Sequence, residues 1–266
     1  LYMSSFVSAL LLTAASAAAL LYPGQVYPTQ ELLQAALPND AINLLLGVPL
    51  LLGSMWLTRR GKLVGLLFWP GALLFVLYNS LARVFDLPVG WLFIANLALV
   101  ALGVYTLSAL VARIDGASVK RRLAGAVRAR LSAAILVGFG LFVILRVGVM
   151  VGRALIGGTA LAETELSVLV ADLLVGPSWV IAGVLLWQRR ALGYVAGVGL
   201  LFQASMLFVG LIGFLALQPF LTAAPFDLAA VITVAIMALP CLVPLALFLR
   251  AILKSEPGGL AADRKG

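Results

Sequence analysis

The residues of this sequence that could carry chemistry are a few polar side chains within long apolar stretches. Arg146 is the most isolated of them, because it lies in the run LFVILRVGVMVGR. If a helix begins near Arg130, a rise of ~1.5 Å per residue puts Arg146 about 24 Å along it. That depth lies inside a hydrocarbon core ~30 Å thick. A cation there needs a paired carboxylate or contact with water.

Asp172 and Asp40 are the carboxylates that we expect as partners of Arg146, because all three are predicted in the outer half of the membrane. Arg146 fits two interpretations. It could bind an anion or a lipid headgroup, or form half of a gating ion pair. Alternatively, it forms a structural salt bridge or extends toward the surface. The two aspartates fit either helix N-caps or carboxylates that face one outer vestibule, where they attract cations or carry protons.

A second polar set follows on the third apolar stretch. Asn79 and Arg83 are four residues apart and share a helical face, and Tyr78 precedes them. Such side chains link membrane helices by hydrogen bonds or line a cavity. The predicted binding residues are therefore Arg146, Asp172, Asp40, Arg83, Asn79 and Tyr78, and no catalytic residue is predicted.

Missing residue types exclude several kinds of chemistry. The chain has no histidine and a single cysteine, Cys241. This excludes His-ligated haem, zinc and di-iron centres, a Ser-His-Asp triad and an internal disulfide. The lysines lie outside the middle of the apolar stretches, which argues against a retinal Schiff base. The sequence predicts neither a metal nor a cofactor.

The overall composition is that of an integral membrane protein. Of 266 residues, 64% are hydrophobic and 11% are charged, whereas soluble domains are about 45–50% apolar and about 25% charged. Stretches of membrane-spanning length predict an all-α protein with eight transmembrane helices. Their predicted ranges are 2–22, 41–58, 63–83, 91–113, 131–154, 168–188, 192–216 and 227–252.

The charges predict the orientation of these helices. If eight helices alternate in direction, fifteen of the 18 cations fall on one side: Arg59, Arg60, Lys62, Arg113, Lys120, Arg121, Arg122, Arg128, Arg130, Arg189, Arg190, Arg250, Lys254, Arg264 and Lys265. Most of the acids fall on the other side. The positive-inside rule then predicts a multi-pass protein of the cytoplasmic membrane with both termini in the cytoplasm.

The net charge of +8 is thus a topology signal, and no nucleic-acid partner is predicted. The basic loop could also bind anionic lipid headgroups, through Lys120, Arg121, Arg122, Arg128 and Arg130.

Two parts of the chain resemble each other in the order of their motifs. A Trp and an Arg-Arg pair end the second stretch (Trp56, Arg59) and also the sixth (Trp187, Arg189). Asp40 and Asp172 also hold matched places. We predict a parallel duplication of two four-helix units, 1–115 and 131–254, with a basic cytoplasmic linker at 116–130 and a cytoplasmic tail at 255–266.

The first unit contains a predicted short amphipathic helix over 28–38. Thr29 is its expected N-cap, and we expect its apolar face to lie in the outer membrane interface.

Three functions fit this pattern. The first is a carrier or pore with a polar cluster in the outer half of the bundle. The second is a non-catalytic membrane subunit or a scaffold that binds lipid or pigment. The third, which we favour least, is an enzyme that acts on lipid at the outer interface through Asp or Glu. Expected partners are membrane lipids, a second copy of the chain or other membrane subunits.

Overall fold

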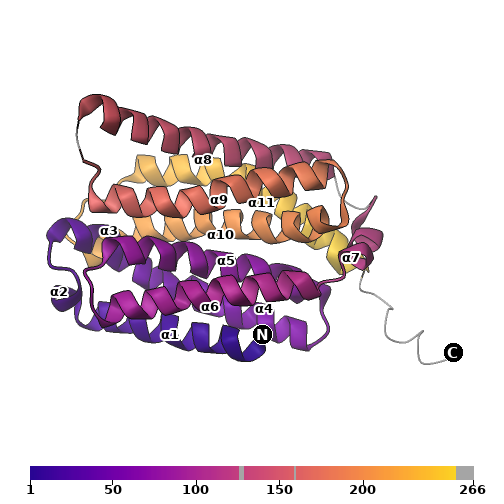
Figure 1. The fold of residues 1–266 in the computed structure, drawn as a ribbon, viewed down its shortest axis with the longest axis horizontal. Coiled ribbons are helices and arrows are strands. Elements are labelled where there is room, and N and C mark those ends of the chain that lie inside the picture. The colour runs from indigo at the N-terminus through magenta and orange to yellow at the C-terminus, as the bar shows by residue number, and fades with distance from the viewer. Residues whose placement is uncertain (126–128, 159, 256–266) are drawn as a thin grey trace.

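The computed structural model describes residues 1–125, 129–158 and 160–255 (Figure 1). Every regular element in these ranges is helical. In chain order they are α1 (Tyr2–Leu21), α2 (Pro23–Val26), α3 (Gln30–Ile42), the π-helical turn η1 (Asn43–Gly47), α4 (Val48–Arg59), α5 (Leu63–Asp86), α6 (Trp91–Arg113), α7 (Gly116–Leu123), α8 (Ala129–Gly157), α9 (Glu163–Trp187), α10 (Ala191–Leu221) and α11 (Leu228–Ser255).

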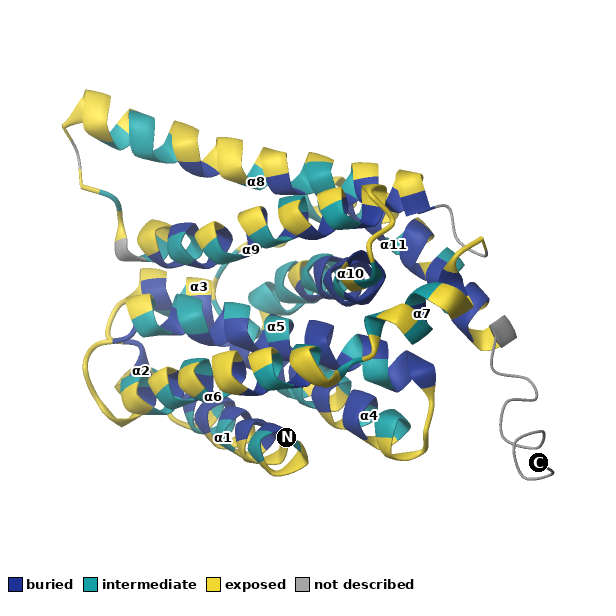
Figure 2. Cartoon of the chain, turned by 45° about the vertical axis from the view of Figure 1, so that its right-hand side comes forward, coloured by how far each residue is buried: buried dark blue, intermediate teal, exposed yellow. Residues whose placement is uncertain are grey.

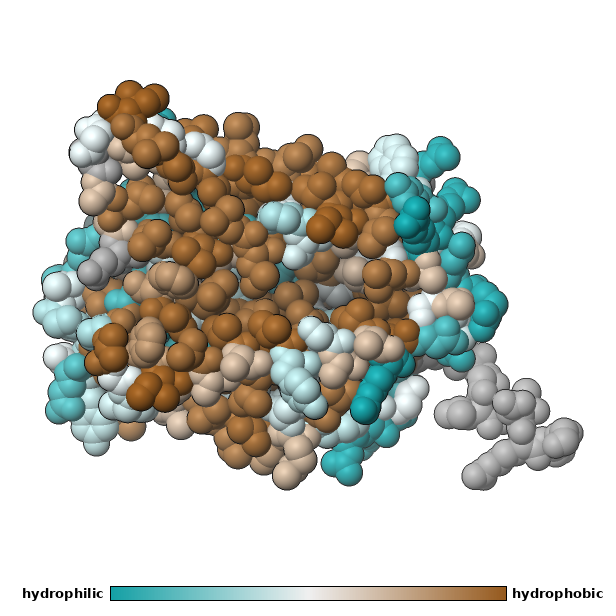
Figure 3. Space-filling view, viewed as in Figure 1, coloured by the Kyte–Doolittle hydropathy of each residue, from teal (hydrophilic) through white to brown (hydrophobic). Residues whose placement is uncertain are grey.

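Within the described ranges, eight helical stretches are long and apolar enough to cross a membrane, as predicted. One of them is the continuous helix from α3 through η1 to α4. The others are α1, α5, α6, α8, α9, α10 and α11. Their long axes run in a similar direction (Figure 1). The face of the molecule seen in Figure 3 is mostly apolar, with hydrophilic residues toward its two ends.

One end of the bundle carries the basic residues predicted for it, and we call it the basic end. Arg59 and Arg113 lie in the last turns of α4 and α6 there, and α7 carries Lys120, Arg121 and Arg122. Asp115 caps α7 by accepting the N–H groups of Ala117 and Ser118. Hydrogen bonds from Ser118 lower the pKa of Asp115. Arg128 and residues 256–266 of the predicted tail lie outside the described residues.

The predicted short surface helix over 28–38 is wrong as a separate element. Thr29 caps it as expected, since its Oγ1 accepts the Leu32 N–H at 3.2 Å, but the helix continues past Pro38 into η1 and α4. Proline removes a backbone donor, and a helix normally loses the hydrogen bond to the carbonyl one turn earlier. Here the Gln218 Nε2 donates to the Gln34 carbonyl at 3.3 Å. A side chain from α10 therefore replaces the donor that Pro38 lacks.

Helices α5 and α10 form the centre of the bundle. In Figure 1 they lie between α1, α4 and α6 on one side and α8, α9 and α11 on the other. Their backbones meet at Gly71 and Gly199, where a Cβ atom added to Gly71 would lie 2.3 Å from the Gly199 carbonyl oxygen. The adjoining stretch Gly193–Ser205 of α10 is mostly buried (Figure 2). This contact joins two groups of helices. The first group is α1–α6, and the second group is α8–α11.

Helix α8 lies at the edge and packs chiefly on α9. Gly140 and Gly183 allow this close contact, because a Cβ atom on either would lie within 2.9 Å of backbone or side-chain atoms of the other helix. Beyond Val147 the side chains of α8 are half-buried or exposed (Figure 2). The second half of α8 therefore has little support from the rest of the described bundle.

Because α5 and α10 are in close contact at Gly71, a single methyl group added there should lower the stability of the protein. We expect Gly71→Ala to lower the free energy of unfolding by about 2 kcal/mol, because the added Cβ must push the Gly199 backbone away. The control is Gly138→Ala, where a Cβ atom would meet nothing within 4 Å in the described part. Thermal unfolding in mild detergent measures both. Equal melting temperatures for the two variants would contradict the close contact.

Candidate functional site

A cavity of about 450 Å³ lies in the middle of the bundle. Helices from both groups contribute to its wall. Asn39, Ile42, Phe75, Tyr78 and Asn79 come from α3 and α5, and the remaining residues come from α8–α11: Phe139, Phe142, Val143, Arg146, Val168, Asp172, Val175, Trp179, Leu207, Phe208, Gly210, Leu211, Phe214 and Met237. The cavity therefore lies between the two predicted four-helix units.

Each wall is one face of a helix. The lining residues of α9 are Val168, Asp172, Val175 and Trp179, which follow one another at three- and four-residue steps. The lining residues of α8 are Phe139, Phe142, Val143 and Arg146, which lie three, four and seven residues after the first. Residues with this spacing share one side of an α-helix, so a single rotation of each helix brings all of them to the cavity. The wall is mainly aromatic and aliphatic.

The charged groups of the cavity wall are Arg146 and Asp172, which form an ion pair that we call the cavity pair. Tyr78 lies next to this pair. An Nη of Arg146 in α8 donates to Asp172 Oδ2 in α9. Tyr78 Oη in α5 donates to Asp172 Oδ1 at 3.1 Å. Both oxygens of Asp172 are thus bound, one by its own group of helices and one by the other group.

The two members of the cavity pair differ in exposure. The Asp172 side chain is 7% exposed, whereas the Arg146 side chain is 45% exposed. The Asp172 carboxylate is therefore hidden from a ligand behind its two donors, whereas much of the Arg146 side chain is accessible. The structure confirms the expected partnership of Arg146 with Asp172, and Asp40 takes no part in it.

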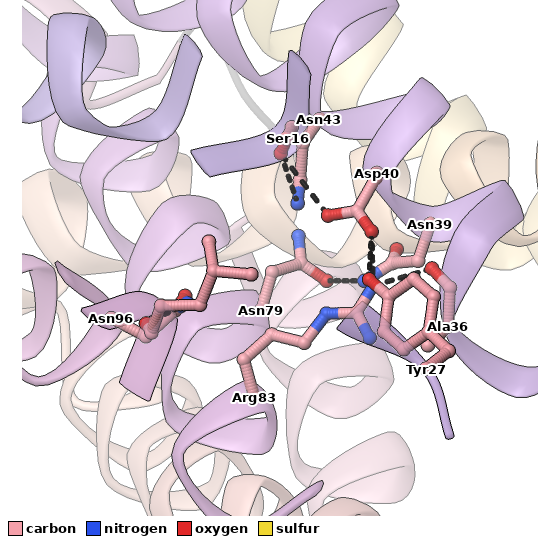
Figure 4. Close-up of polar contacts among 10 residues, drawn as sticks. Ser16, Tyr27, Ala36, Asn39, Asp40, Asn43, Asn79, Arg83 and Asn96 are labelled. Atoms are coloured by element: carbon pink, nitrogen blue, oxygen red, sulfur yellow. Dashed lines mark hydrogen bonds and ion pairs between the residues drawn. The ribbon is translucent and has the colours of Figure 1, made fainter. Parts of the chain in front are cut away.

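Asp40 instead belongs to a second polar group, which we call the buried cluster (Figure 4). Arg83 donates to Asp40 Oδ2 at 3.0 Å and also to the Ala36 carbonyl. Tyr27 donates to the same carboxylate, and Ser16 Oγ donates to Asp40 Oδ1 at 3.2 Å. The Arg83 side chain is only 4% exposed. This cluster ties α1, α3 and α5 together and is closed to any large ligand.

The phenol of Tyr27 lies just outside the membrane-spanning helices. Burial, as the main cause, raises its pKa above the ordinary value. Tyr27 thus keeps its proton and acts as a donor to Asp40.

Asn39 and Asn79 are two further polar residues of the cavity wall. Asn39 Nδ2 donates to Asn79 Oδ1 at 3.3 Å, and both residues line the cavity. Asn79 lies one turn from Arg83 on α5, as the sequence predicted (Figure 4). Of the six predicted binding residues, Arg146, Asp172, Tyr78 and Asn79 thus line the cavity, whereas Asp40 and Arg83 belong to the buried cluster.

The interpretation of Asp40 and Asp172 as helix N-caps is wrong. Asp40 lies near the end of α3, which runs on into η1, and Asp172 lies well inside α9. Both helices begin earlier than predicted, because polar residues such as Glu31 and Glu165 are accepted in their first turns. The two carboxylates are stabilised by cations and hydroxyl groups and not by helix ends.

The apolar wall of the cavity was missed by reasoning from the sequence. Phe139, Phe142, Trp179, Phe208 and Phe214 supply most of its aromatic surface. Their helical spacing was visible in the sequence, but every apolar stretch of a membrane protein contains such residues. Only the neighbouring helices decide whether they face lipid or a cavity.

Comparisons with protein-family models, with curated proteins and with solved structures return no match to this chain. Its function is therefore argued from the geometry of the site alone. In that geometry, Asp40 and Asp172 are each held in an ion pair with an arginine.

Because the two ion pairs differ in burial, removing the carboxylate from each should lower the free energy of unfolding by different amounts. We expect Asp40→Asn to lower the free energy of unfolding by about 3–5 kcal/mol, because it leaves Arg83 buried and unpaired. Asp172→Asn should cost about 1 kcal/mol or less, because the half-exposed Arg146 can move. Chemical unfolding in mild detergent compares them.

The double variant Asp40→Asn with Arg83→Gln is the control for this interpretation. It should recover part of the stability, since no unpaired charge remains. Equal losses for the two single variants would show that Arg83 and Arg146 are equally buried in the folded protein.

Proposed function

We propose that the protein is a carrier-like membrane protein that holds a largely apolar solute between two four-helix units. The observation that carries the proposal is the cavity of about 450 Å³. Its size is that of a small-molecule site, about 300–1,000 Å³. Its wall comes from both units, and in transporters built from repeats the substrate site also lies at the repeat interface near the membrane midplane.

The proposal includes a parallel duplication, which two equivalent turns support. The first turn follows α4, where Gly61 has a positive φ of 72° and its N–H bonds to Thr58. The second follows α9, where Arg189 has a positive φ of 54° and its N–H bonds to Leu186. In each turn the next N–H bonds back to the carbonyl five residues earlier. Both helices thus end in the same Schellman turn.

The glycines after these turns also correspond. A Cβ atom on Gly65 would lie 2.4 Å from the Thr58 nitrogen, and one on Gly193 would lie 2.4 Å from the Leu186 nitrogen. Gly71 follows Gly65 by the same number of residues as Gly199 follows Gly193. Gly71 and Gly199 meet at the centre of the bundle. Two copies of one helix–turn–helix unit would explain these matched contacts.

The turns set a register that differs from the one suggested by the tryptophans. Trp56 precedes Gly61 by five residues, whereas Trp187 precedes Arg189 by two. The Trp residues are therefore about one helical turn out of register. Asp40 and Asp172 are similarly displaced, which agrees with their separate partners. The duplication rests on the glycines.

The proposed location is the cytoplasmic membrane with both chain termini in the cytoplasm. This follows from the basic end, because Lys and Arg are retained on the cytoplasmic side. In this orientation the cavity pair lies in the outer half of the bundle.

A second candidate function is a membrane subunit that assembles with another chain. The specific observation is the second half of α8, where Gly148 and Gly152 have GxxxG spacing. A Cβ atom at either would meet nothing within 4 Å in the described part of the chain. A partner helix could approach closely at this face.

The orientation is testable with single cysteines. On a Cys241→Ser background, we expect Val89→Cys to react with an impermeant maleimide added to intact cells. Ala117→Cys should react only after the membrane is opened, since it lies at the basic end. Both residues are exposed. The opposite pattern would reverse the proposed topology.

The cavity is testable by filling it. Native mass spectrometry of the protein, extracted from its own membrane in mild detergent, should show a bound small molecule or lipid. Val143→Trp should remove that mass, because Val143 lines the cavity. Leu145→Trp is the control, since Leu145 is 66% exposed and does not line it.

Two outcomes would contradict the carrier-like proposal. One is a bound mass that is unchanged in Val143→Trp. The other is a stoichiometric protein partner in place of any small molecule, which would favour the subunit function.

A further inference from the structure

The Arg146 guanidinium has hydrogen-bond donors to spare. A guanidinium carries five N–H donors, and the hydrogen bond of Arg146 is the one from an Nη to Asp172. Nearly half of the side chain is exposed. Within a membrane, unused donors of a cation are costly, so an acceptor-rich group next to Arg146 would be strongly favoured.

Asp172 offers no equivalent site for a cation. Its Oδ1 accepts from Tyr78 and its Oδ2 accepts from Arg146, and the side chain is 7% exposed. A cationic group would have to displace one of these donors. The accessible charge of the cavity is therefore positive.

The rest of the wall is suited to an apolar chain. From the cavity pair, the cavity passes Phe142 and Phe139 on α8 and Val175 and Trp179 on α9. Phe208 and Phe139 contact each other at a ring-centroid distance of 5.4 Å, and Phe139 and Trp179 at 6.5 Å. A small, hydrated anion would make no use of such an apolar surface.

Two residues of the cavity wall are also exposed. Phe142 and Leu211 line the cavity and are 50% and 43% exposed. Both lie in helices of membrane-spanning length, α8 and α10. The cavity is therefore open at these residues, and a molecule could enter there and leave its polar group beside Arg146.

From these observations we infer that the cavity takes an amphiphile with one anionic headgroup, a phosphate or a carboxylate. The headgroup binds the accessible side of the Arg146 guanidinium, which suits planar, bidentate contact with such groups. The apolar chain lies along the aromatic wall. This inference rests on the proposed function and names its substrate class.

The test uses four amphiphiles with the same chain and different headgroups. Purified protein is mixed with hexadecyl phosphate, hexadecanoate, hexadecanol and hexadecylamine, and native mass spectrometry counts each adduct. We expect the two anions to exceed the alcohol and the amine by about tenfold, the effect of a charge-assisted hydrogen bond. Equal binding of all four would overturn the inference.

Variants of the cavity pair test which charge is responsible. Arg146→Gln should remove the preference for the anions, and Arg146→Lys should restore part of it. Asp172→Asn should leave anion binding unchanged or stronger, because it removes a neighbouring negative charge. Loss of binding in Asp172→Asn with retention in Arg146→Gln would overturn the inference in favour of a cation. Arg153→Gln is the control, since Arg153 is exposed on the same helix and does not line the cavity.

Inorganic phosphate distinguishes a free anion from a headgroup. We expect it not to displace hexadecyl phosphate at equal concentration, and displacement would overturn the amphiphile. Val143→Trp separates the two proposals. If it abolishes binding of all four amphiphiles while Arg146→Gln has no effect, the cavity binds apolar molecules but the anionic preference is wrong. If no amphiphile binds the wild-type protein, the proposed function fails as well.

Discussion

The close contact of α5 with α10 is the constraint on which the rest of the bundle depends. Gly71 and Gly199 let two backbones touch where any side chain would separate them. In a membrane, apolar residues gain little by leaving lipid, so such close packing is a main source of helix association. Further along the same two helices, Phe75 and Gly210 line the cavity. The two helices thus touch at these glycines, and the cavity lies further along them, away from this close contact.

The two Asp–Arg pairs show how position alone gives similar residues different roles. Arg83 is enclosed by Asp40, Tyr27 and the Ala36 carbonyl, so it fastens α5 to α3 and to the segment before α3. Arg146 lies on a peripheral helix and shares only one contact with Asp172, so part of its charge faces the cavity. An enclosed ion pair stabilises a fold only while both partners are present. An open one can add a ligand as a further partner.

The predicted separate helix over residues 28–38 was wrong for a physical reason. Pro38, together with a polar first turn, is typical of a helix that stops, because proline removes a donor. The Gln218 side chain supplies that donor from a helix far along the chain. No local pattern contains this contact. The same holds for the helix N-cap interpretation of Asp40, which failed because the helix continued.

The sequence by itself determined the class of protein, the number of membrane-length helices and the basic end. These follow from composition and local hydropathy, which act residue by residue along the chain. It also identified the arginines and aspartates that form the two buried or half-buried ion pairs, since a charged group is conspicuous in an apolar stretch. The tertiary structure decided that Arg146 pairs with Asp172 and Arg83 with Asp40, and which aromatic residues form the cavity wall. These features depend on how each helix is rotated against its neighbours, and contacts between distant glycines set that rotation.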